Sequence, residues 1–423
     1  MKNLETLIQE LCPDGVEFVK LGEVGTFYGG LSGKSKADFT DGNAKFITYM
    51  NVYSNPSLDI NIEDKVQIKE GEKQNTVEYG DILFTGSSET PDECGMTSVL
   101  TEQTDEKLYL NSFCFGYRFN DVDSISPGYM KHLFRSHSLR KALAKTASGV
   151  TRFNVSKKKV AKIEIPLPPL EVQTEIVRIL DKFTSLEAEL EAELDCRKRQ
   201  YEYYRDKLLS FENAGGQEVE WKKMSEVIYS INTGLNPRRF FRLNTPDATN
   251  YYVTIREMKN GNIIFSDDTD KINNEAMKLC NNRSNLEKGD LIFSGTGTIG
   301  QIVVLKETPT NWNIKEGLYA LKPIKEVIDS KFLAYILNES SIRKAYTKKA
   351  LGGTVKSVPM KVLTSIKLPI PSLREQQRIV SILDRFESLT TSLQSGLPAE
   401  IAARRQQYEY YRDKLLTFKR KAS

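Results

Sequence analysis

Apolar side chains between residues 171 and 211 recur at alternating steps of four and three, the spacing of a coiled-coil seam. Nine of the eleven seam positions are apolar or aromatic, so the pattern predicts one long helix. Pro168 and Pro169 mark its expected start, and the Asn-Ala-Gly-Gly segment at 213–216 marks its end. At about 1.5 Å per residue it would be roughly 60 Å long, so we interpret it as a spacer. The seam positions are Ile176, Leu180, Phe183, Glu187, Leu190, Leu194, Arg197, Tyr201, Tyr204, Leu208 and Phe211.

A second helix with the same stripe is predicted near the end of the chain. Ile379 and Phe386 match Ile176 and Phe183 at a constant offset of 203 residues. The stripe then resumes at an offset of 207 residues, so four residues are inserted near Ser395–Pro398. Because proline inside a helix costs about 3 kcal/mol, we expect a break or kink there, and exact twofold symmetry of the helices is in doubt.

Both stripes belong to an internal duplication. Residues 200–209, with the sequence QYEYYRDKLL, recur without change at 407–416. The offset of 203 residues also superposes Thr151 on Thr354 and Val16 on Val219. A repeat of this length describes two copies of a domain plus a helix, because solenoid units have only 20–50 residues.

The segments before the two helices predict mixed domains. Residues 16–165 and 215–368 contain short β-rich runs bounded by Gly, Asn and Asp turns, and each has one clear helix near its end, at 127–147 and 329–350. The expected fold class is α+β, with two similar globular domains, each followed by a long helix. We expect the two helices to pair as an antiparallel coiled coil with pseudo-twofold symmetry. The expected boundaries are 1–165 for an N-terminal segment and the first domain, 166–214 for the central helical spacer, 215–368 for the second domain and 369–423 for the C-terminal helical spacer.

Composition narrows the class of protein only slightly. A net charge of +4 permits nucleic-acid binding without requiring it. Five scattered cysteines without a C-x-x-C pair argue for a reducing compartment, and against a disulfide framework or a zinc site. No apolar run approaches the length that spans a membrane, and the N-terminus does not resemble a signal peptide. We therefore expect a cytoplasmic protein that has no membrane partner.

Motifs for catalysis or cofactor binding are weak. The segment 295–300, GTGTIG, has the spacing of a dinucleotide loop, and the overlapping FSGTG resembles an S-adenosylmethionine signature. A cofactor loop opens a helix, whereas the following QIVVL is strand-like, so we predict a tight β-turn. The sequence contains no N/D-P-P-Y/F/W base-flipping motif and no Walker A loop, and His132 and His137 are its only histidines. We predict no catalytic residue, no metal site and no cofactor bound by this chain.

Gly-rich loops that carry cations occupy matching places in the two copies. They lie at 29–36 and 148–152 in the first copy, and at 234–242 and 352–356 in the second. Arg and Lys can read guanine, and Ser or Thr can bind phosphate or base edges, although any one loop could equally be a solvated turn. The DNA-binding candidates are Ser32, Lys34, Lys36, Thr151, Arg152, Arg238, Arg239, Arg242, Thr354 and Lys356.

The helices carry more aromatic surface than a two-helix seam needs. Tyr203 and Tyr410 lie off the seam, and tyrosine is an effective anchor for a protein partner. The candidates for helix pairing or partner binding are Phe183, Tyr201, Tyr203, Tyr204, Phe386, Tyr408, Tyr410 and Tyr411.

The repeated Q-x-x-I-V-x-I-L-D-x-F segments, at 173–183 and 376–386, and the two decamers are similar to those of specificity subunits of type I restriction-modification systems. This resemblance covers essentially the whole chain. It implies two target recognition domains, each reading half of a bipartite double-stranded DNA sequence, and helices that also bind two modification subunits. Those partners would carry S-adenosylmethionine and methylate adenine at N6, and restriction subunits would add cleavage. Two alternatives are a coiled-coil scaffold without DNA function and an enzyme that fuses recognition with methylation.

Overall fold

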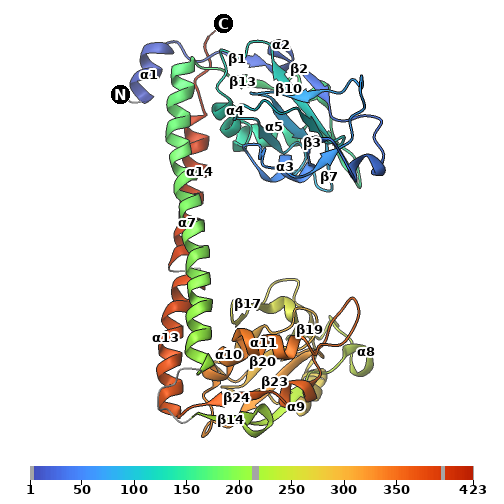
Figure 1. Ribbon diagram of the computed structural model, residues 1–423, viewed down its shortest axis with the longest axis vertical. Helices are drawn as coiled ribbons and strands as arrows, with labels where there is room; N and C mark the ends of the chain where they lie inside the picture. The colour runs from blue at the N-terminus through green and yellow to red at the C-terminus, as the bar shows by residue number, and fades with distance from the viewer. Residues whose placement is uncertain (1–3, 212–218, 392–395, 423) are drawn as a thin grey trace. The chain divides into compact units, whose positions relative to one another are not determined.

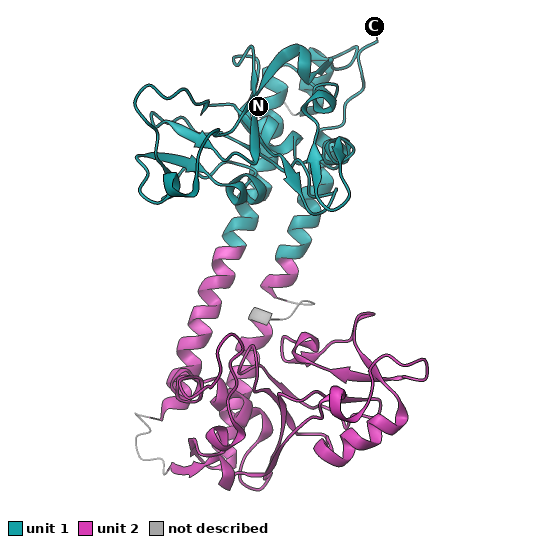
Figure 2. Ribbon diagram, turned by 90° about the vertical axis from the view of Figure 1, so that its right-hand side faces the viewer, with its two compact units in different colours: residues 1–190, 401–423 teal, residues 191–400 magenta. Residues whose placement is uncertain are grey.

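A computed structural model describes residues 4–211, 219–391 and 396–422 of the chain. The chain forms two compact units, coloured separately in Figure 2. Unit 1 comprises Met1–Leu190 and Ile401–Ser423, and unit 2 comprises Glu191–Glu400. Neither unit is a single sequence repeat. The decamer at 407–416, from the second repeat, belongs to unit 1, and the decamer at 200–209, from the first repeat, belongs to unit 2.

A four-stranded antiparallel sheet forms the centre of unit 1, in the order β2-β10-β6-β8. Figure 1 labels its strands β2 and β10. Every side chain of β6 is buried, because apolar clusters cover both faces of this sheet. Phe84 packs edge-on against Phe134 of the helical layer, whereas Leu83 belongs to a cluster that includes Val52. The strands are β2 (Gly25–Gly29), β6 (Ile82–Thr85), β8 (Thr97–Val99) and β10 (Cys114–Phe119).

Smaller sheets and short helices complete unit 1. Its remaining strands pair as β1-β13, β4-β3-β9-β5 and β11-β12-β7, and β3 and β9 are parallel. The strands are β1 (Phe18–Lys20), β3 (Ala44–Ile47), β4 (Lys65–Val66), β5 (Thr76–Val77), β7 (Ser87–Ser88), β9 (Leu108–Leu110), β11 (Ala147–Ser148), β12 (Phe153–Val155) and β13 (Glu164–Pro166). The helices are α1 (Leu4–Leu11), α2 (Leu21–Val24), α3 (Tyr49–Ser54), α4 (Pro127–Leu133), α5 (His137–Ala144), α6 (Lys157–Val160) and the 3-10 helix η1 (Lys36–Phe39).

Unit 2 repeats this plan. Its central antiparallel sheet has the order β15-β23-β20-β21, and a parallel pair, β16-β22, corresponds to β3-β9. The strands are β14 (Glu220–Lys223), β15 (Ile228–Thr233), β16 (Asn250–Val253), β17 (Met258–Lys259), β18 (Asn262–Ile263), β19 (Lys271–Ile272), β20 (Leu291–Ser294), β21 (Ile302–Val304), β22 (Trp312–Ile314), β23 (Leu318–Pro323) and β24 (Lys367–Ile370). The helices are α8 (Pro237–Phe240), α9 (Asn274–Ser284), α10 (Ser330–Asn338), α11 (Ser340–Thr347), α12 (Met360–Thr364) and the 3-10 helices η2 (Met224–Glu226) and η3 (Ile255–Glu257). The α+β fold class predicted from the sequence is confirmed.

The single helix predicted near the end of each domain is in fact two helices. In unit 1, α4 ends at Leu133 and α5 begins at His137, and in unit 2, α10 ends at Asn338 and α11 begins at Ser340. Glu339 is the N-cap of α11: its carboxylate accepts hydrogen bonds from the backbone N–H groups of Ser341 and Ile342. An apolar pattern alone does not reveal such a break.

Helix α7 (Leu170–Ser210) follows the predicted stripe and adds a second packed face near its end. It starts directly after Pro168-Pro169, and Ile176 and Leu180 are fully buried. Near its end, however, Arg205 and Leu209 are buried although both lie off the stripe, and the stripe residue Arg197 is exposed. The last turns of α7 therefore use a second face, which packs into the core of unit 2.

Two separate helices stand where the sequence predicted a break. Helix α13 (Leu373–Thr391) precedes α14 (Leu397–Leu415), and Gly396 has a φ of 79° just before α14. Part of the four-residue insertion lies in 392–395, outside the described residues.

Aromatic pairs join the long helices within each unit. In unit 1, Phe183 of α7 stacks on Tyr411 of α14 with ring centres 5.3 Å apart, and Glu187 bonds Arg405, so these helices run in opposite directions. In unit 2, Tyr204 of α7 stacks on Phe386 of α13 at 5.9 Å. Each pair joins the Q-x-x-I-V-x-I-L-D-x-F segment of one repeat to the decamer of the other repeat.

A buried glutamine fastens each long helix to its domain. Gln173 accepts the backbone N–H of Ser126 at 2.9 Å and donates to the carbonyls of Ser124 and Pro168. Gln376 makes the same three bonds in unit 2, 203 residues later, to Asp329, Val327 and Pro371. Because every polar atom of these buried amides has a partner, the start of each helix is fixed on its domain.

Candidate nucleic-acid interface

The loops predicted to bind DNA in the first domain meet at one edge of unit 1. Loop 29–36 follows β2, and the Leu31 N–H donates to the carbonyl of Leu110, directly before the turn 111–113, at 2.7 Å. Hairpin 147–155 reaches the same turn, because the guanidinium of Arg152 lies over the ring of Phe113, 5.5 Å from its centre. Sequence analysis missed this turn, although an aromatic residue within the polar turn 111–113 was an available signal.

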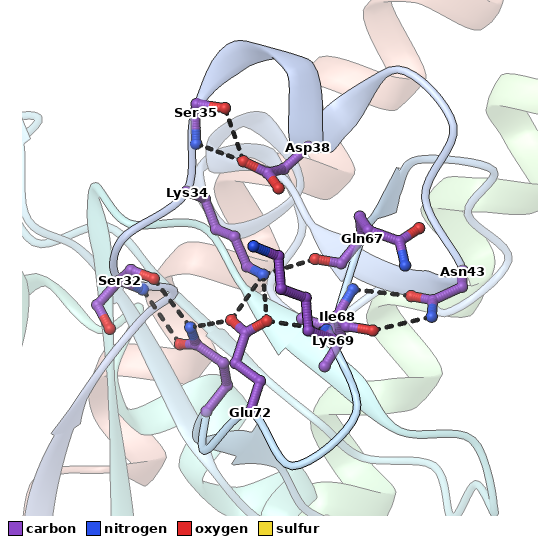
Figure 3. Close-up of polar contacts among 10 residues, drawn as sticks. Ser32, Lys34, Ser35, Asp38, Asn43, Gln67, Ile68, Lys69 and Glu72 are labelled. Carbon is purple, nitrogen blue, oxygen red and sulfur yellow. Dashed lines mark hydrogen bonds and ion pairs between the residues drawn. The ribbon is translucent and has the colours of Figure 1, made fainter.

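Lys34 lies inside this edge rather than on its surface. Its ammonium group is 2.6 Å from the carboxylate of Glu72 and 2.5 Å from the carbonyl of Gln67, and only 6% of the side chain is exposed (Figure 3). The backbone of Ser32 exchanges two hydrogen bonds with the side chain of Gln74. Lys34 and Ser32 thus tie loop 29–36 to a second loop, 67–75.

Loop 67–75 adds cations that sequence analysis did not select. Lys69 and Lys73 are exposed on it, and Lys36 is exposed at the start of η1. The Lys34 ammonium, the Lys69 backbone N–H and Gln74 donate to Glu72 and lower its pKa to about 2. Glu72 therefore stays ionised at neutral pH, and the two loops that carry these three exposed lysines remain linked.

Hairpin 147–155 holds the remaining candidates of unit 1. Thr151 and Arg152 are both exposed, and Val150 at the tip is 92% exposed. The Arg152 Nε donates to the Ser87 Oγ at 3.1 Å. The arginine is therefore held by two contacts, one with a hydroxyl and one with an aromatic ring.

Unit 2 brings its two predicted loops to the equivalent edge. The Glu316 N–H donates to the Leu235 carbonyl at 3.4 Å, which sets loop 234–242 beside the turn 315–317. The Gly295 N–H donates to the backbone carbonyl of Gly317, and the Gly297 N–H donates to the backbone carbonyl of Lys356, both at 2.9 Å. The segment 295–297 thereby joins the turn 315–317 to hairpin 351–357, the counterpart of hairpin 147–155.

Three arginines are presented by loop 234–242. Arg238 and Arg239 lie on the short helix α8, whose first N–H groups are capped by Asn236, and Arg242 follows it. All three arginines are exposed, as is Phe240, and within the described ranges none of the three has an ion-pair partner. This combination of exposed cations with an aromatic ring is typical of surfaces that contact nucleic acids.

The glycine-rich segment 295–300 is a turn, as predicted. It joins β20 to β21, which are antiparallel neighbours, and no helix follows it. The Ser294 Oγ donates to the carbonyl of Thr298 and accepts the N–H of Gln301. Thr354 and Lys356 are exposed on the adjoining hairpin.

The aromatic candidates on the helices divide into those that pack against another side chain of the fold and two that are mostly exposed. Phe183, Tyr411, Tyr204 and Phe386 form the stacked pairs described above. Tyr408 contacts His132, and Tyr201 packs at the core of unit 2. Tyr203 and Tyr410 remain 60% and 61% exposed, with Lys207 and Lys414 over their rings. Only these last two have most of their surface available to a partner.

An aspartate in each decamer, ion-paired with the arginine before it, makes a contact that was not anticipated. Asp206 lies against the start of α11, where it accepts the N–H of Ser340 at 3.2 Å. Asp413 accepts the N–H of His137 at the start of α5, at 3.0 Å. The exact repetition of the decamer was the available signal, since these residues make matching contacts in the two units.

Metal-ligand clusters and membrane-spanning helices are both absent from the described ranges. No group of three or more His, Cys, Asp or Glu residues there could hold a metal ion. In the same part of the chain, no helix combines the length and apolar character needed to cross a membrane.

Comparison with known proteins agrees with the duplicated architecture. The type I restriction modification DNA specificity domain matches residues 13–195 and again 217–403. The chain is 36% identical to the specificity subunit of a type I restriction enzyme of Escherichia coli, over 61% of this chain and 63% of that relative, less than two thirds of its length. It is 34% identical to a putative type I restriction enzyme specificity subunit of Haemophilus influenzae, over 64% and 68% of the two chains.

One solved structure supports the fold over nearly the whole chain. It concerns complex assembly and conformational transition of the type I R-M system, and its chain matches with a TM-score of 0.60 and 19% identity. The match covers 95% of this chain and 97% of that chain. Because the family pattern occurs twice and covers most of the sequence, the chain belongs to the specificity subunits of type I restriction-modification systems.

Proposed function

We propose that this chain reads a bipartite double-stranded DNA sequence, with one half-site bound by each unit. The observation that carries the proposal is the matched pair of loop clusters around the turns 111–113 and 315–317. Both clusters present cations that lack acidic partners within the described residues, yet their side chains differ, as two half-sites of different sequence would require. Lys36, Lys69, Arg238, Arg239 and Lys356 suit contacts to phosphate, which supply affinity without specificity.

The chemistry would reside in partner subunits. Two modification subunits would carry S-adenosylmethionine and methylate adenine at N6, restriction subunits would cleave DNA, and this chain would bind no cofactor. The exposed Tyr203 and Tyr410 occupy matching positions on the two decamers, which suits a partner present in two copies. Turn geometry at 295–300 also speaks against a cofactor loop in this chain.

Exchange of one domain tests the two-reader proposal. Residues 16–165 would be replaced by the corresponding domain of another specificity subunit, and the methylated sequence would be determined by long-read sequencing. We expect one half of the methylated motif to change while the other half and its activity persist. A change in both halves, or a continuous motif, would contradict the proposal.

Two further measurements separate the alternatives. A scaffold without DNA function would shift no duplex in a gel-shift titration with the purified chain. A fused methylation enzyme would bind S-adenosylmethionine stoichiometrically in calorimetry, whereas we expect no binding to the chain alone.

A further inference from the structure

Hairpins 147–155 and 351–357 are equivalent in geometry as well as in sequence. Gly149 and Gly352 have positive φ angles of 151° and 117°. A Cβ added to Gly149 would lie 2.0 Å from the carbonyl oxygen of Arg152, and one added to Gly352 would lie 2.3 Å from that of Val355. The same tight turn therefore places Arg152 in unit 1 where unit 2 has Val355.

The two equivalent residues are held differently. Arg152 is braced by the Ser87 hydroxyl and by the ring of Phe113, and no described residue accepts a hydrogen bond from its two terminal amino groups. In unit 2 the hydroxyl of Thr296 instead contacts that of Ser357 at 2.9 Å, and Val355 is 60% exposed. One hairpin thus presents a prearranged guanidinium, and the other presents an aliphatic side chain.

Both hairpins suit a polyanion. Residues 147–159 and 350–361 contain no Asp or Glu, and each stretch carries lysine or arginine. A two-stranded ribbon fits the major groove of B-DNA, which is about 12 Å wide, but not the minor groove, which is about 6 Å wide. In the major groove, guanine offers two acceptors to an arginine fork, and thymine offers a methyl group to an aliphatic side chain.

We propose that Arg152 and Val355 are the specificity-determining residues of the two hairpins, with Arg152 reading a guanine and Val355 reading a thymine methyl group. The inference rests on the proposed DNA-reading function and deepens it. Phe113 and Ser87 act as positioning residues, because they fix the guanidinium before DNA arrives and so reduce the entropy lost on binding.

The experiment selects duplexes from a randomised double-stranded DNA library with the full-length chain and with its variants. Arg152→Ala should lose its preference at one guanine in one half-site, by roughly 5- to 150-fold, and leave the other half-site unchanged. In the wild-type chain, 7-deazaguanine at that position should cause a similar loss, because it lacks the N7 acceptor, whereas the variant should be indifferent to it. Phe113→Ala should weaken the same preference without changing others.

Val355 has a matching test in the other half-site. Uracil in place of one thymine removes a single methyl group and should weaken binding by the wild-type chain about fourfold, an effect absent from Val355→Ala. The control variant Lys158→Ala removes an exposed cation near the first hairpin and should weaken all duplexes equally.

The outcomes separate the two levels of the hypothesis. If Arg152→Ala weakens all duplexes equally, or relaxes a base other than guanine, the reading role of Arg152 is wrong while two-unit recognition stands. If the wild-type chain enriches no sequence, or enriches a continuous one, the proposed function itself fails. Should Arg152→Ala not fold, the 7-deazaguanine and uracil measurements on the wild-type chain still decide the question.

Discussion

The carboxylate of Asp413, in the second sequence repeat, accepts a hydrogen bond from the backbone N–H of His137, in the first repeat, at 3.0 Å. The mirror contact joins Asp206 of the first repeat to Ser340 of the second. Each carboxylate binds an N–H at the start of a helix, where such groups have no partner within the helix. Each domain thus packs against the decamer of the other repeat.

We predict that Asp413→Ala destabilises the start of α5 and leaves α11 unchanged, and that Asp206→Ala does the reverse. Loss of a helix-capping carboxylate typically costs about 1 kcal/mol, which is roughly a fivefold rise in local opening. Hydrogen exchange of the backbone amides of α5 and α11 would measure it.

Asparagine is the control at both positions, since Asp413→Asn retains an oxygen acceptor and should lose less protection. If Asp413→Ala affected α11 as strongly as α5, the assignment of decamer 407–416 to unit 1 and decamer 200–209 to unit 2 would be incorrect.

The sequence predicted the duplication, the α+β class, the break before α14 and the places of the loops. It did not reveal which decamer completes which unit, because an exact repeat fits both domains equally well. That assignment depends on the three-dimensional path of the chain. It is visible in the burial of Leu209 in the main core of unit 2 and of Leu416 in the main core of unit 1.

The roles of single cations were less predictable. Lys34 and Lys36 are two residues apart and have the same local composition, yet Lys34 is buried against Glu72 and Lys36 is exposed. The difference comes from a loop that begins 33 residues after Lys34, as its contact with Gln67 shows, and neither periodicity nor turn chemistry specifies that contact.

From the surroundings of His132 we predict that the stability of unit 1, and not that of unit 2, depends on pH. Its ring is 1% exposed, with Nε2 2.6 Å from Asp181 and Nδ1 2.9 Å from the hydroxyl of Tyr408. Burial lowers the pKa of His132, and the nearby cations Lys131 and Arg412 act in the same direction, against the opposing effect of Asp181.

In the unfolded chain this histidine binds a proton below its usual pKa of about 6.5, whereas the folded form stays neutral to lower pH. The contribution of His132 to the free energy of unfolding is therefore fully present above pH 6.5. It is lost as the pH falls towards the pKa of the folded form, by no more than about 1.4 kcal/mol per pH unit. Unit 2 has Tyr335 at the equivalent position, bonded to Asp384 and Glu387, and burial raises the pKa of that phenol.

Hydrogen exchange at about pH 5.5 and 7.5, corrected for intrinsic rates, should show weaker protection of α4 at the lower pH and little change in α10. His132→Gln should remove this difference while lowering protection at both values. Equal acid sensitivity of both units in the wild-type chain would argue against His132 as the cause.

Lys34 and Lys36 should differ in how they affect DNA binding. Lys36→Ala removes an exposed charge and should reduce the slope of log affinity against log salt by about 1, uniformly across sequences. Lys34→Ala should instead loosen loops 29–36 and 67–75, because it leaves the Glu72 carboxylate without its ammonium partner.

A double-mutant cycle distinguishes these roles. Lys34→Ala and Glu72→Gln share one interaction, so their combined effect on DNA affinity should fall short of the sum of the single effects. Lys36→Ala with Glu72→Gln serves as the matched control and should be additive. Additivity in both cycles would mean that the Lys34 link does not organise this edge.

Tyr203 and Tyr410 should matter for assembly with partner subunits and not for folding. Both rings are about 60% exposed at the same position of the repeated decamer, and each has a lysine ammonium within 6 Å of the ring centre. A large ring on an exposed helix face loses little conformational entropy on burial, and tyrosine is enriched among residues that dominate binding energy. Replacing both with alanine should cost about 2 kcal/mol per site, or roughly 30-fold in affinity for each copy of a partner.

Co-purification and calorimetry would measure this loss of affinity, with Glu202→Ala and Glu409→Ala as the control pair from the same decamers. Unchanged assembly by the tyrosine variant would place the partner surface elsewhere, whereas loss of one partner copy from each single variant would assign one copy to each decamer.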